Sequence, residues 1–180
     1  GTTPVTASGQ PVGLMLDKSG SGNHATQPTA ASRPIYRRGD SRGVVNLLTW
    51  SEDFGNAAWN KTDSTVTANA VTAPDGTLTA DKLVEGITIE NHNVYRGVNY
   101  TATAHSYSVR VKNAGRNFIW LRASHSSSSF SGAFFNLTTG EITGVSNCTA
   151  SVVALSSGWF ECRIVYTPTT AVAGYVYVYI

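Results

Sequence analysis

The sequence has few charged residues, and it lacks both a long apolar run and a strong charge of one sign. Aspartate, glutamate, lysine and arginine make up 13% of the 180 residues, about half the usual share in globular domains. The formal net charge of +2 is too small to predict a nucleic-acid partner or an anionic membrane surface. No apolar run approaches ~18 residues, so membrane insertion is not expected. The first residues also lack a signal-peptide pattern. If the protein acts outside a cell, we expect another route, such as virion release, or a leader upstream of Gly1.

Cysteine is scarce as well, since Cys148 and Cys162 are the two in the sequence. They could form a disulfide, but that requires Cα atoms within about 7 Å of each other, which a sequence does not show. Cys162 alternates with Phe160 and Ile164 in a register typical of core-facing positions. Two free, buried thiols are the favoured prediction, and a disulfide stays open as the alternative.

The first forty residues are rich in proline, threonine and glycine and hold one short apolar cluster, at positions 12–16. Such a segment cannot bury enough apolar surface to form a core of its own. We therefore predict an extended arm or connector over residues 1–43, followed by a folded domain over residues 44–180. A basic cluster precedes the domain and consists of Arg37, Arg38 and Arg42.

From Val44 onward, short alternating segments are separated by turn signals, which is typical of β-strands. The turn at Pro74-Asp75-Gly76 shows why: proline presets φ, aspartate caps locally, and glycine tolerates a positive φ. About ten strands with one apolar face each predict an all-β, two-sheet antiparallel β-sandwich of the jelly-roll kind. The expected strands are Val44–Trp50, Thr65–Val71, Thr79–Glu85, His92–Tyr100, Ser106–Lys112, Asn117–Ala123, Gly132–Asn136, Cys148–Leu155, Trp159–Thr167 and Tyr175–Ile180.

Several stretches resemble carbohydrate-binding-module-like domains of bacteriophage tail and structural proteins. They cover nearly the whole chain in order: Asn46-Leu47-Leu48-Thr49-Trp50-Ser51-Glu52-Asp53-Phe54, Asn56-Ala57-Ala58-Trp59, Ala80-Asp81-Lys82-Leu83, Phe135-Asn136-Leu137-Thr138-Thr139-Gly140 and Gly158-Trp159-Phe160-Glu161-Cys162. The resemblance implies a jelly roll, no catalysis, and either glycan binding or decoration of a capsid or tail. The start of the arm is similar to phage tail connectors.

The resemblance also carries two expectations about single features. Such domains continue to a final strand with a Trp-Gly-Ala-Gln-Leu-Glu-like motif, which this sequence lacks. We therefore expect a fragment, or a subunit whose missing edge strand comes from a neighbour, because an unpaired inner strand promotes aggregation. Jelly-roll sugar modules often hold a structural calcium ion near the first strand, and the hard oxygen donors there are Asn46, Glu52 and Asp53.

Catalytic patterns are weak, so the protein is not expected to be an enzyme. The four histidines are scattered, and no two have the spacing of metal ligands. Glu52 and Asp53 are adjacent, so along a strand they would face opposite sides. No nucleophile elbow, phosphate loop or dinucleotide fingerprint is present.

A glycan site requires aromatic rings flanked by groups that bind hydroxyls. Ile119 and Leu121 have a core-facing register, which turns Phe118, Trp120 and Arg122 to the outer face of their strand. The alternative is that Trp120 packs under a loop or against a neighbouring subunit.

Pairing with the Ser106–Lys112 strand would bring Arg110 and Lys112 to the same outer face as Trp120. On the last strand, Tyr175, Tyr177 and Tyr179 form a stripe opposite the apolar positions. This stripe could extend the stacking surface for a sugar, or it could be the contact for an oligomer or for the missing strand. The tryptophans at 50, 59 and 159 are assigned to structure.

These patterns favour a non-catalytic carbohydrate-binding module of a phage or prophage tail or virion protein, which binds host-surface or environmental polysaccharide. The expected location is the virion or the extracellular space, with a glycan and other virion subunits as partners in a homo-oligomer. Two alternatives stay open. One is a purely structural oligomerisation or decoration domain, and the other is an accessory module of a secreted polysaccharide-degrading enzyme.

Overall fold

The computed structural model describes residues 10–16, 21–33, 46–126 and 129–180. It divides the chain into two compact units, Gly1–Asn46 and Leu47–Ile180, and each is described by itself below. Within the described ranges, no helix is long and apolar enough to cross a membrane.

The first unit holds a two-stranded antiparallel sheet, of β1 (Leu14–Met15) and β2 (Ala25–Thr26), and one 3-10 turn, η1 (Ala30–Ser32). Arg33 follows the turn and donates hydrogen bonds from Nε to the Gln27 carbonyl (2.8 Å) and from Nη2 to the Pro28 carbonyl (3.1 Å). None of the described residues in this unit is buried, so backbone and guanidinium hydrogen bonds replace an apolar core. The expected basic cluster lies outside the described residues.

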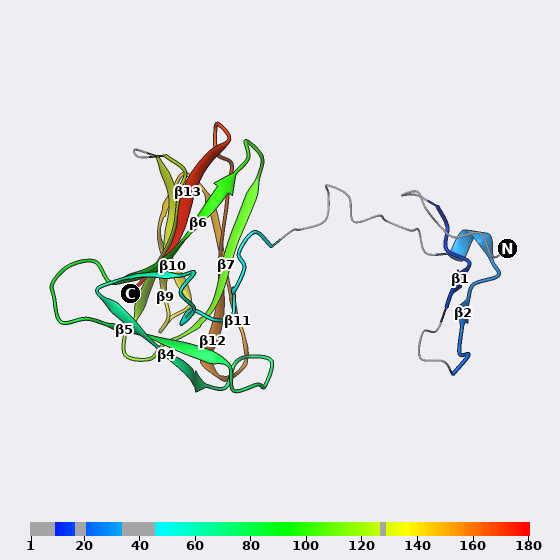
Figure 1. Ribbon diagram of the computed structural model, residues 1–180, viewed down its shortest axis with the longest axis horizontal. Coiled ribbons are helices and arrows are strands. Elements are labelled where there is room, and N and C mark those ends of the chain that lie inside the picture. Colours follow the sequence, from blue (N-terminus) through cyan, green and yellow to red (C-terminus); the bar gives the residue numbers. More distant parts are fainter. Residues whose placement is uncertain (1–9, 17–20, 34–45, 127–128) are drawn as a thin grey trace. The chain divides into compact units, whose positions relative to one another are not determined.

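The second unit is all-β and antiparallel (Figure 1), which confirms the predicted fold class. Its strands are β3 (Asn60–Thr62), β4 (Ser64–Val71), β5 (Ala80–Glu85), β6 (Asn93–Tyr100), β7 (His105–Lys112), β8 (Phe118–Ser124), β9 (Phe130–Asn136), β10 (Glu141–Ser146), β11 (Thr149–Ala154), β12 (Trp159–Tyr166) and β13 (Val172–Tyr179). The hydrogen-bonded orders are β10-β9-β8-β13-β6-β3, β11-β12-β7 and β4-β5.

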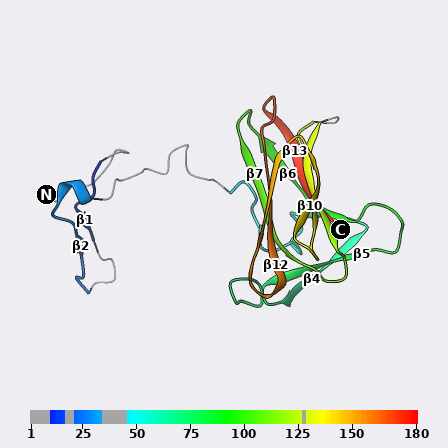
Figure 2. The same cartoon turned by 180° about the vertical axis from the view of Figure 1, so that it is seen from behind.

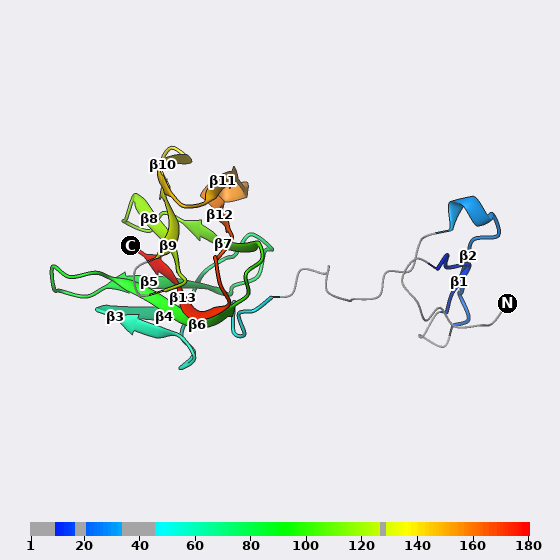
Figure 3. The ribbon, with the colours of Figure 1, turned by 90° about the horizontal axis from the view of Figure 1, so that it is seen from above.

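The six-stranded and three-stranded sheets form two layers, with β12 packed against β8 and β9 across the interface. Figure 3 shows β7, β11 and β12 beside the layer that contains β8, β9 and β13, and Figure 2 shows β7, β12 and β13 from behind the view of Figure 1. Apolar residues at alternate positions of both sheets meet between the layers and form the core, because successive side chains of a strand point to opposite faces. The most deeply buried members include Val94, Leu121, Ala133, Phe135, Cys162 and Ile164.

Two tryptophans and Cys162 behave as the sequence predicts, whereas Cys148 is free as predicted but only half-buried. Trp59 and Trp159 are buried, and the Trp59 indole donates a hydrogen bond to the Trp50 carbonyl at 2.8 Å. Cys148 and Cys162 are both free, and Cys162 is fully buried. Trp50 differs from the other two, since the residue is 58% exposed with a positive φ of 59°, and its backbone carbonyl is the part that contacts Trp59.

Most predicted strands of the second unit agree with observed ones, with three exceptions. Residues 46–50 form irregular structure and a turn instead of a strand, and the other two residues of the expected Val44–Trp50 strand lie outside the described residues. Two observed strands, the three-residue β3 and β10, were not predicted. The alternation of β10 is interrupted at Gly144, where its pairing with β9 shifts register, so the period-two pattern is lost.

The expectation of an unpaired inner strand is also wrong for β13. This strand pairs with β6 along its whole length and with β8 from Tyr175 to Tyr179. From Tyr175 to Tyr179 the strand is therefore paired on both sides, and this part of it is not an edge that a neighbouring subunit could complete. The jelly-roll connectivity and the missing final strand stay predictions.

Candidate ligand-binding face

The outward side of the four central strands of the six-stranded sheet carries a continuous group of aromatic rings. Alternation along β6, β8, β9 and β13 turns these rings away from the core. We call this surface the aromatic face; its members are Tyr95, Phe118, Trp120, Phe130, Phe134, Tyr175, Tyr177 and Tyr179, together with Arg122.

Strand register brings these residues together from three distant parts of the chain. Trp120 of β8 lies opposite Phe134 of β9 on one side and Tyr179 of β13 on the other. One row further along, Tyr177 lies opposite both Arg122 and Tyr95. Residues directly opposite on neighbouring strands have Cβ atoms about 5 Å apart, which is close enough for ring contact.

Trp120 lies between two other rings instead of presenting an open platform. Its ring is stacked on Phe134 at 5.0 Å with an interplanar angle of 8°, and the Tyr179 ring lies 4.9 Å away at 31°. Because these partners come from opposite sides of β8, both faces of the indole are covered. The outward direction of Trp120 is as predicted, and neighbouring rings of the same sheet cover its two faces.

The stack continues along the tyrosine stripe. The Tyr177 ring is stacked on Tyr179 at 5.4 Å and on Tyr95 at 5.2 Å, both at 23°. Burial among these rings raises the pKa of the Tyr177 hydroxyl. Rings that stand side by side in this way stabilise the sheet, and they show mainly their edges to solvent.

Arg122 lies at the centre of the aromatic face. Its guanidinium carbon is 4.7 Å from the Phe130 ring, 5.3 Å from Trp120 and 5.6 Å from Tyr177. Its Nη1 atom lies 3.4 Å from the Tyr179 hydroxyl. Cation–π attraction therefore holds the side chain in place, and no carboxylate of the described residues forms an ion pair with it.

Arg110 does not share this face, which corrects the sequence analysis. β7 pairs with β12 in the three-stranded sheet, and both edges of β8 are already taken by β9 and β13. Arg110 forms an ion pair with Glu161 (Nε–Oε2 3.2 Å) on that other sheet. Lys112 is also on β7, so it too lies in the three-stranded sheet and not beside Trp120. Sequence patterning shows which way a side chain points, but it does not show which strand is adjacent.

Tyr175 is the tyrosine of the stripe that is open to solvent, at 45% exposure. Its ring is turned out of the stack, at 75° to Tyr95 and 55° to Tyr177. The residue opposite it on β6 is Gly97, which has no side chain to cover the ring.

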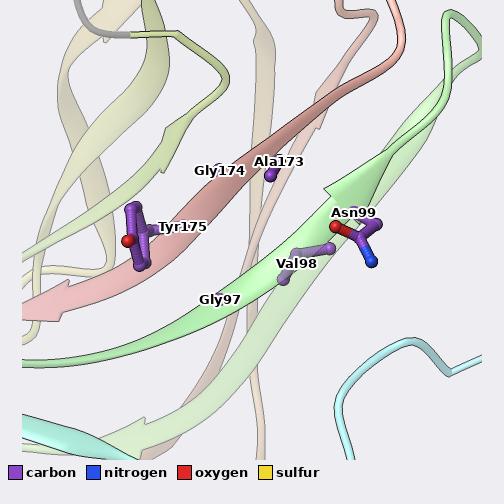
Figure 4. A pocket seen from close by; sticks show the side chains of 6 residues that line it. All are labelled: Gly97, Val98, Asn99, Ala173, Gly174 and Tyr175. Carbon is purple, nitrogen blue, oxygen red and sulfur yellow. The ribbon is translucent and has the colours of Figure 1, made fainter.

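A depression of about 210 Å³ lies beside this ring, lined by Gly97, Val98, Asn99, Ala173, Gly174 and Tyr175. Figure 4 shows the Tyr175 ring and the Asn99 amide on either side of it, with the two glycines between them. Asn99 is exposed, and its amide makes no hydrogen bond to the described residues. The depression therefore combines an open ring, a small-residue floor and a free amide.

The three expected calcium ligands do not belong to one unit of the chain. Asn46 belongs to the first unit, whereas Glu52 and Asp53 belong to the second. The Asp53 carboxylate accepts hydrogen bonds from the backbone N–H (3.0 Å) and side-chain amide (3.3 Å) of Asn56. In the described ranges no three His, Cys, Asp or Glu side chains form a group that could hold a metal ion. The calcium ion stays a prediction.

Sequence reasoning missed five members of this region: Tyr95, Gly97, Asn99, Phe130 and Phe134. The alternation of Phe130, Gly132 and Phe134 was a usable signal for an aromatic outward face. Tyr95 and Gly97 had no such signal, because their role depends on pairing with β13, which lies about 80 residues further along the chain.

Comparison with known proteins finds no family model that matches this chain and no curated protein that is significantly similar to it.

Proposed function

We propose that this domain is a non-catalytic carbohydrate-binding module and that it binds polysaccharide on the aromatic face, at the Tyr175 ring. The observation that carries the proposal is an open aromatic ring beside a shallow depression that holds a free amide. Sugar rings have apolar C–H faces that stack on aromatic rings, and their hydroxyls require donors and acceptors at the edge. Tyr175 offers the first surface, and Asn99 offers both a donor and an acceptor.

The shape of the region favours a polymer over a small molecule. At about 210 Å³ the depression is smaller than the pockets that enclose small ligands, which span about 300–1,000 Å³. A shallow site that is open on the sheet surface leaves both ends of a bound sugar free. A polysaccharide chain can therefore lie along β6 and β13 while one of its sugars occupies the depression.

The sequence resemblance supports placing this module on a bacteriophage or prophage tail or virion protein. There the ligand would be host-surface or environmental polysaccharide. Many copies on one particle would turn a weak site into useful avidity, since each further binding event is effectively intramolecular. The accessory module of a polysaccharide-degrading enzyme uses the same binding chemistry with catalysis located elsewhere.

Affinity electrophoresis in native gels that contain polysaccharides, together with a glycan array, tests the proposal. Tyr175→Ala should reduce the affinity for a bound polymer about five- to tenfold, because a stacked ring contributes about 1–1.5 kcal/mol. Tyr175→Phe should retain most of the binding, since it keeps the ring. Trp50→Ala is the matched control, because that ring is exposed but lies outside the aromatic face. Unchanged retention of Tyr175→Ala by every bound polymer would exclude this site.

A purely structural role is the second candidate, and a specific observation favours it. Phe118 and Phe134 are 49% and 44% exposed on the same face, and aromatic residues are enriched in the cores of protein interfaces. Light scattering across a concentration series distinguishes the two roles. Self-association that Phe134→Ser abolishes would favour the structural role, whereas a strict monomer at high concentration would exclude it.

A further inference from the structure

The aromatic face carries a single charge. By alternation, the outward positions of β6, β8, β9 and β13 hold aromatic rings, Gly, Ala, Ser or Asn, with Arg122 as the exception. All of these positions are described. An acid does occur on the edge strand β10, where Glu141 lies opposite Asn136 and accepts a hydrogen bond from Thr139.

That acid is too far away to neutralise the guanidinium. Asn136 lies opposite Phe118, which is four residues from Arg122 on β8, a separation of about 13 Å along the strand. Arg122 is therefore a cation in a largely apolar surface, where an opposite charge interacts more strongly than in open water.

Two of the three guanidinium nitrogens have no hydrogen-bond acceptor among the described residues. Nη1 is near the Tyr179 hydroxyl, at a long 3.4 Å. Nε is buried and has no acceptor among the described residues. Nη2 has none there either, but it is not a buried atom. Together Nε and Nη2 form one edge of the guanidinium, and that edge can donate two parallel hydrogen bonds to a carboxylate.

We propose that the aromatic face selects acidic polysaccharides and that the guanidinium of Arg122 binds a sugar carboxylate, as in a uronic acid. This inference rests on the proposed function. Ligand arrives at Nη2, the accessible nitrogen, and Nε completes the pair once the surrounding rings shift to admit the second oxygen. Tyr177 lies between Arg122 and Tyr175 on the sheet, so neighbouring sugars of one chain can reach the carboxylate site and the Tyr175 ring.

The test uses the full 180-residue chain in native gels that contain polygalacturonate, alginate or hyaluronan. Each polymer is tested as supplied and after chemical reduction of its carboxyl groups, which yields a neutral polymer with the same backbone, and dextran is included as an uncharged reference. We expect the chain to bind at least one acidic polymer about tenfold or more tightly than its reduced form. The binding should weaken as NaCl is raised.

Variants separate a specific carboxylate contact from a general charge effect. Arg122→Gln should lower the affinity for the acidic polymer to that for the reduced form. The affinity of Arg122→Lys should lie between those of the parent chain and Arg122→Gln, because an ammonium is a point charge that cannot form the two-pronged contact. Arg110→Gln removes the same charge from the opposite sheet and should leave binding unchanged. Thermal unfolding of each variant checks that it is folded.

The outcomes distinguish this inference from the proposed function. Equal binding of acidic and reduced polymers, or acidic binding that Arg122→Gln leaves intact, overturns the acidic specificity while Tyr175-dependent glycan binding stands. Equal losses in Arg122→Gln and Arg110→Gln also overturn it, since net charge alone would explain them. Failure to bind any polymer overturns both proposals.

Discussion

Alanine at Gly174 tests how closely β13 lies against its neighbours, and alanine at Gly97 is the matched control. The two glycines are on paired strands, with Gly97 opposite Tyr175, the residue after Gly174. A Cβ built on Gly174 would lie 2.0 Å from the Ser124 carbonyl oxygen and 2.7 Å from a Tyr100 ring carbon. A Cβ on Gly97 would have its nearest neighbours at 3.9 Å.

These distances set the expected free energies of unfolding. At Gly174 the obstacle includes the backbone of β8, so the strands must separate by about 1 Å, and the cost should reach the upper end of the usual 1–3 kcal/mol for overpacking. At Gly97 the new methyl group makes ordinary contacts, and the unfolded chain loses freedom, which should stabilise by about 0.4–1 kcal/mol. For a chain of this length, 1 kcal/mol shifts Tm by about 2–4 °C. Gly174→Ala should therefore melt about 6–12 °C below the parent chain.

Thermal and urea unfolding followed by circular dichroism measure both variants. The urea m-value should be unchanged, so that the midpoint reports stability alone. Gly97→Ala carries a second expectation, because its methyl group enters the depression beside Tyr175 and should weaken glycan retention without lowering Tm. A Gly174→Ala chain as stable as the parent would refute the close packing of β8 and β13. Gly97→Ala losing more than about 1 kcal/mol would refute the open space assigned to that position.

Three further predictions concern buried groups. Burial raises the pKa of the Cys162 thiol to about 12. Ellman's reagent at pH 8 should therefore label half-buried Cys148 slowly and Cys162 only after unfolding. Fast reaction of both thiols in the native chain would be inconsistent with this burial. Burial also raises the pKa of Tyr100 to about 12, so the fold favours its neutral form. The stability it contributes should be present below pH 10 and be lost between pH 10 and 12, and Tyr100→Phe should flatten that part of a urea-midpoint profile, whereas an unaltered profile would contradict it. Leu121 is fully buried, so Leu121→Ala should cost about 2–5 kcal/mol, and a loss under 1 kcal/mol in urea would argue against its central place in the core.

The direction of side chains could be predicted from period two alone, because a strand alternates whatever its neighbours are. Ile119 and Leu121 are buried as predicted, and Phe118, Trp120 and Arg122 point outward. What alternation cannot supply is strand adjacency. Arg110 has the right outward register but lies in the other sheet.

The sequence also did not show which outward ring is open to solvent. Trp120 and Tyr175 both point outward, and by size alone the Trp120 ring is the better candidate for stacking on a sugar. Trp120 is covered because its partners across β9 and β13 are Phe134 and Tyr179. Tyr175 is open because its β6 partner is Gly97, and only the pairing of distant strands shows that difference.

The sequence by itself determined the local features of this protein: all-β strands, their inward and outward faces, and the turn at Pro74-Asp75-Gly76 with its positive φ of 91° at Gly76. These depend on steric rules that act over a few residues. Tertiary structure alone decided which strands are neighbours, and with it the ring stack, the solitary Arg122 and the depression beside Tyr175. Such contacts join residues as far apart as Tyr95 and Tyr177, and their geometry is fixed by the packing of whole sheets.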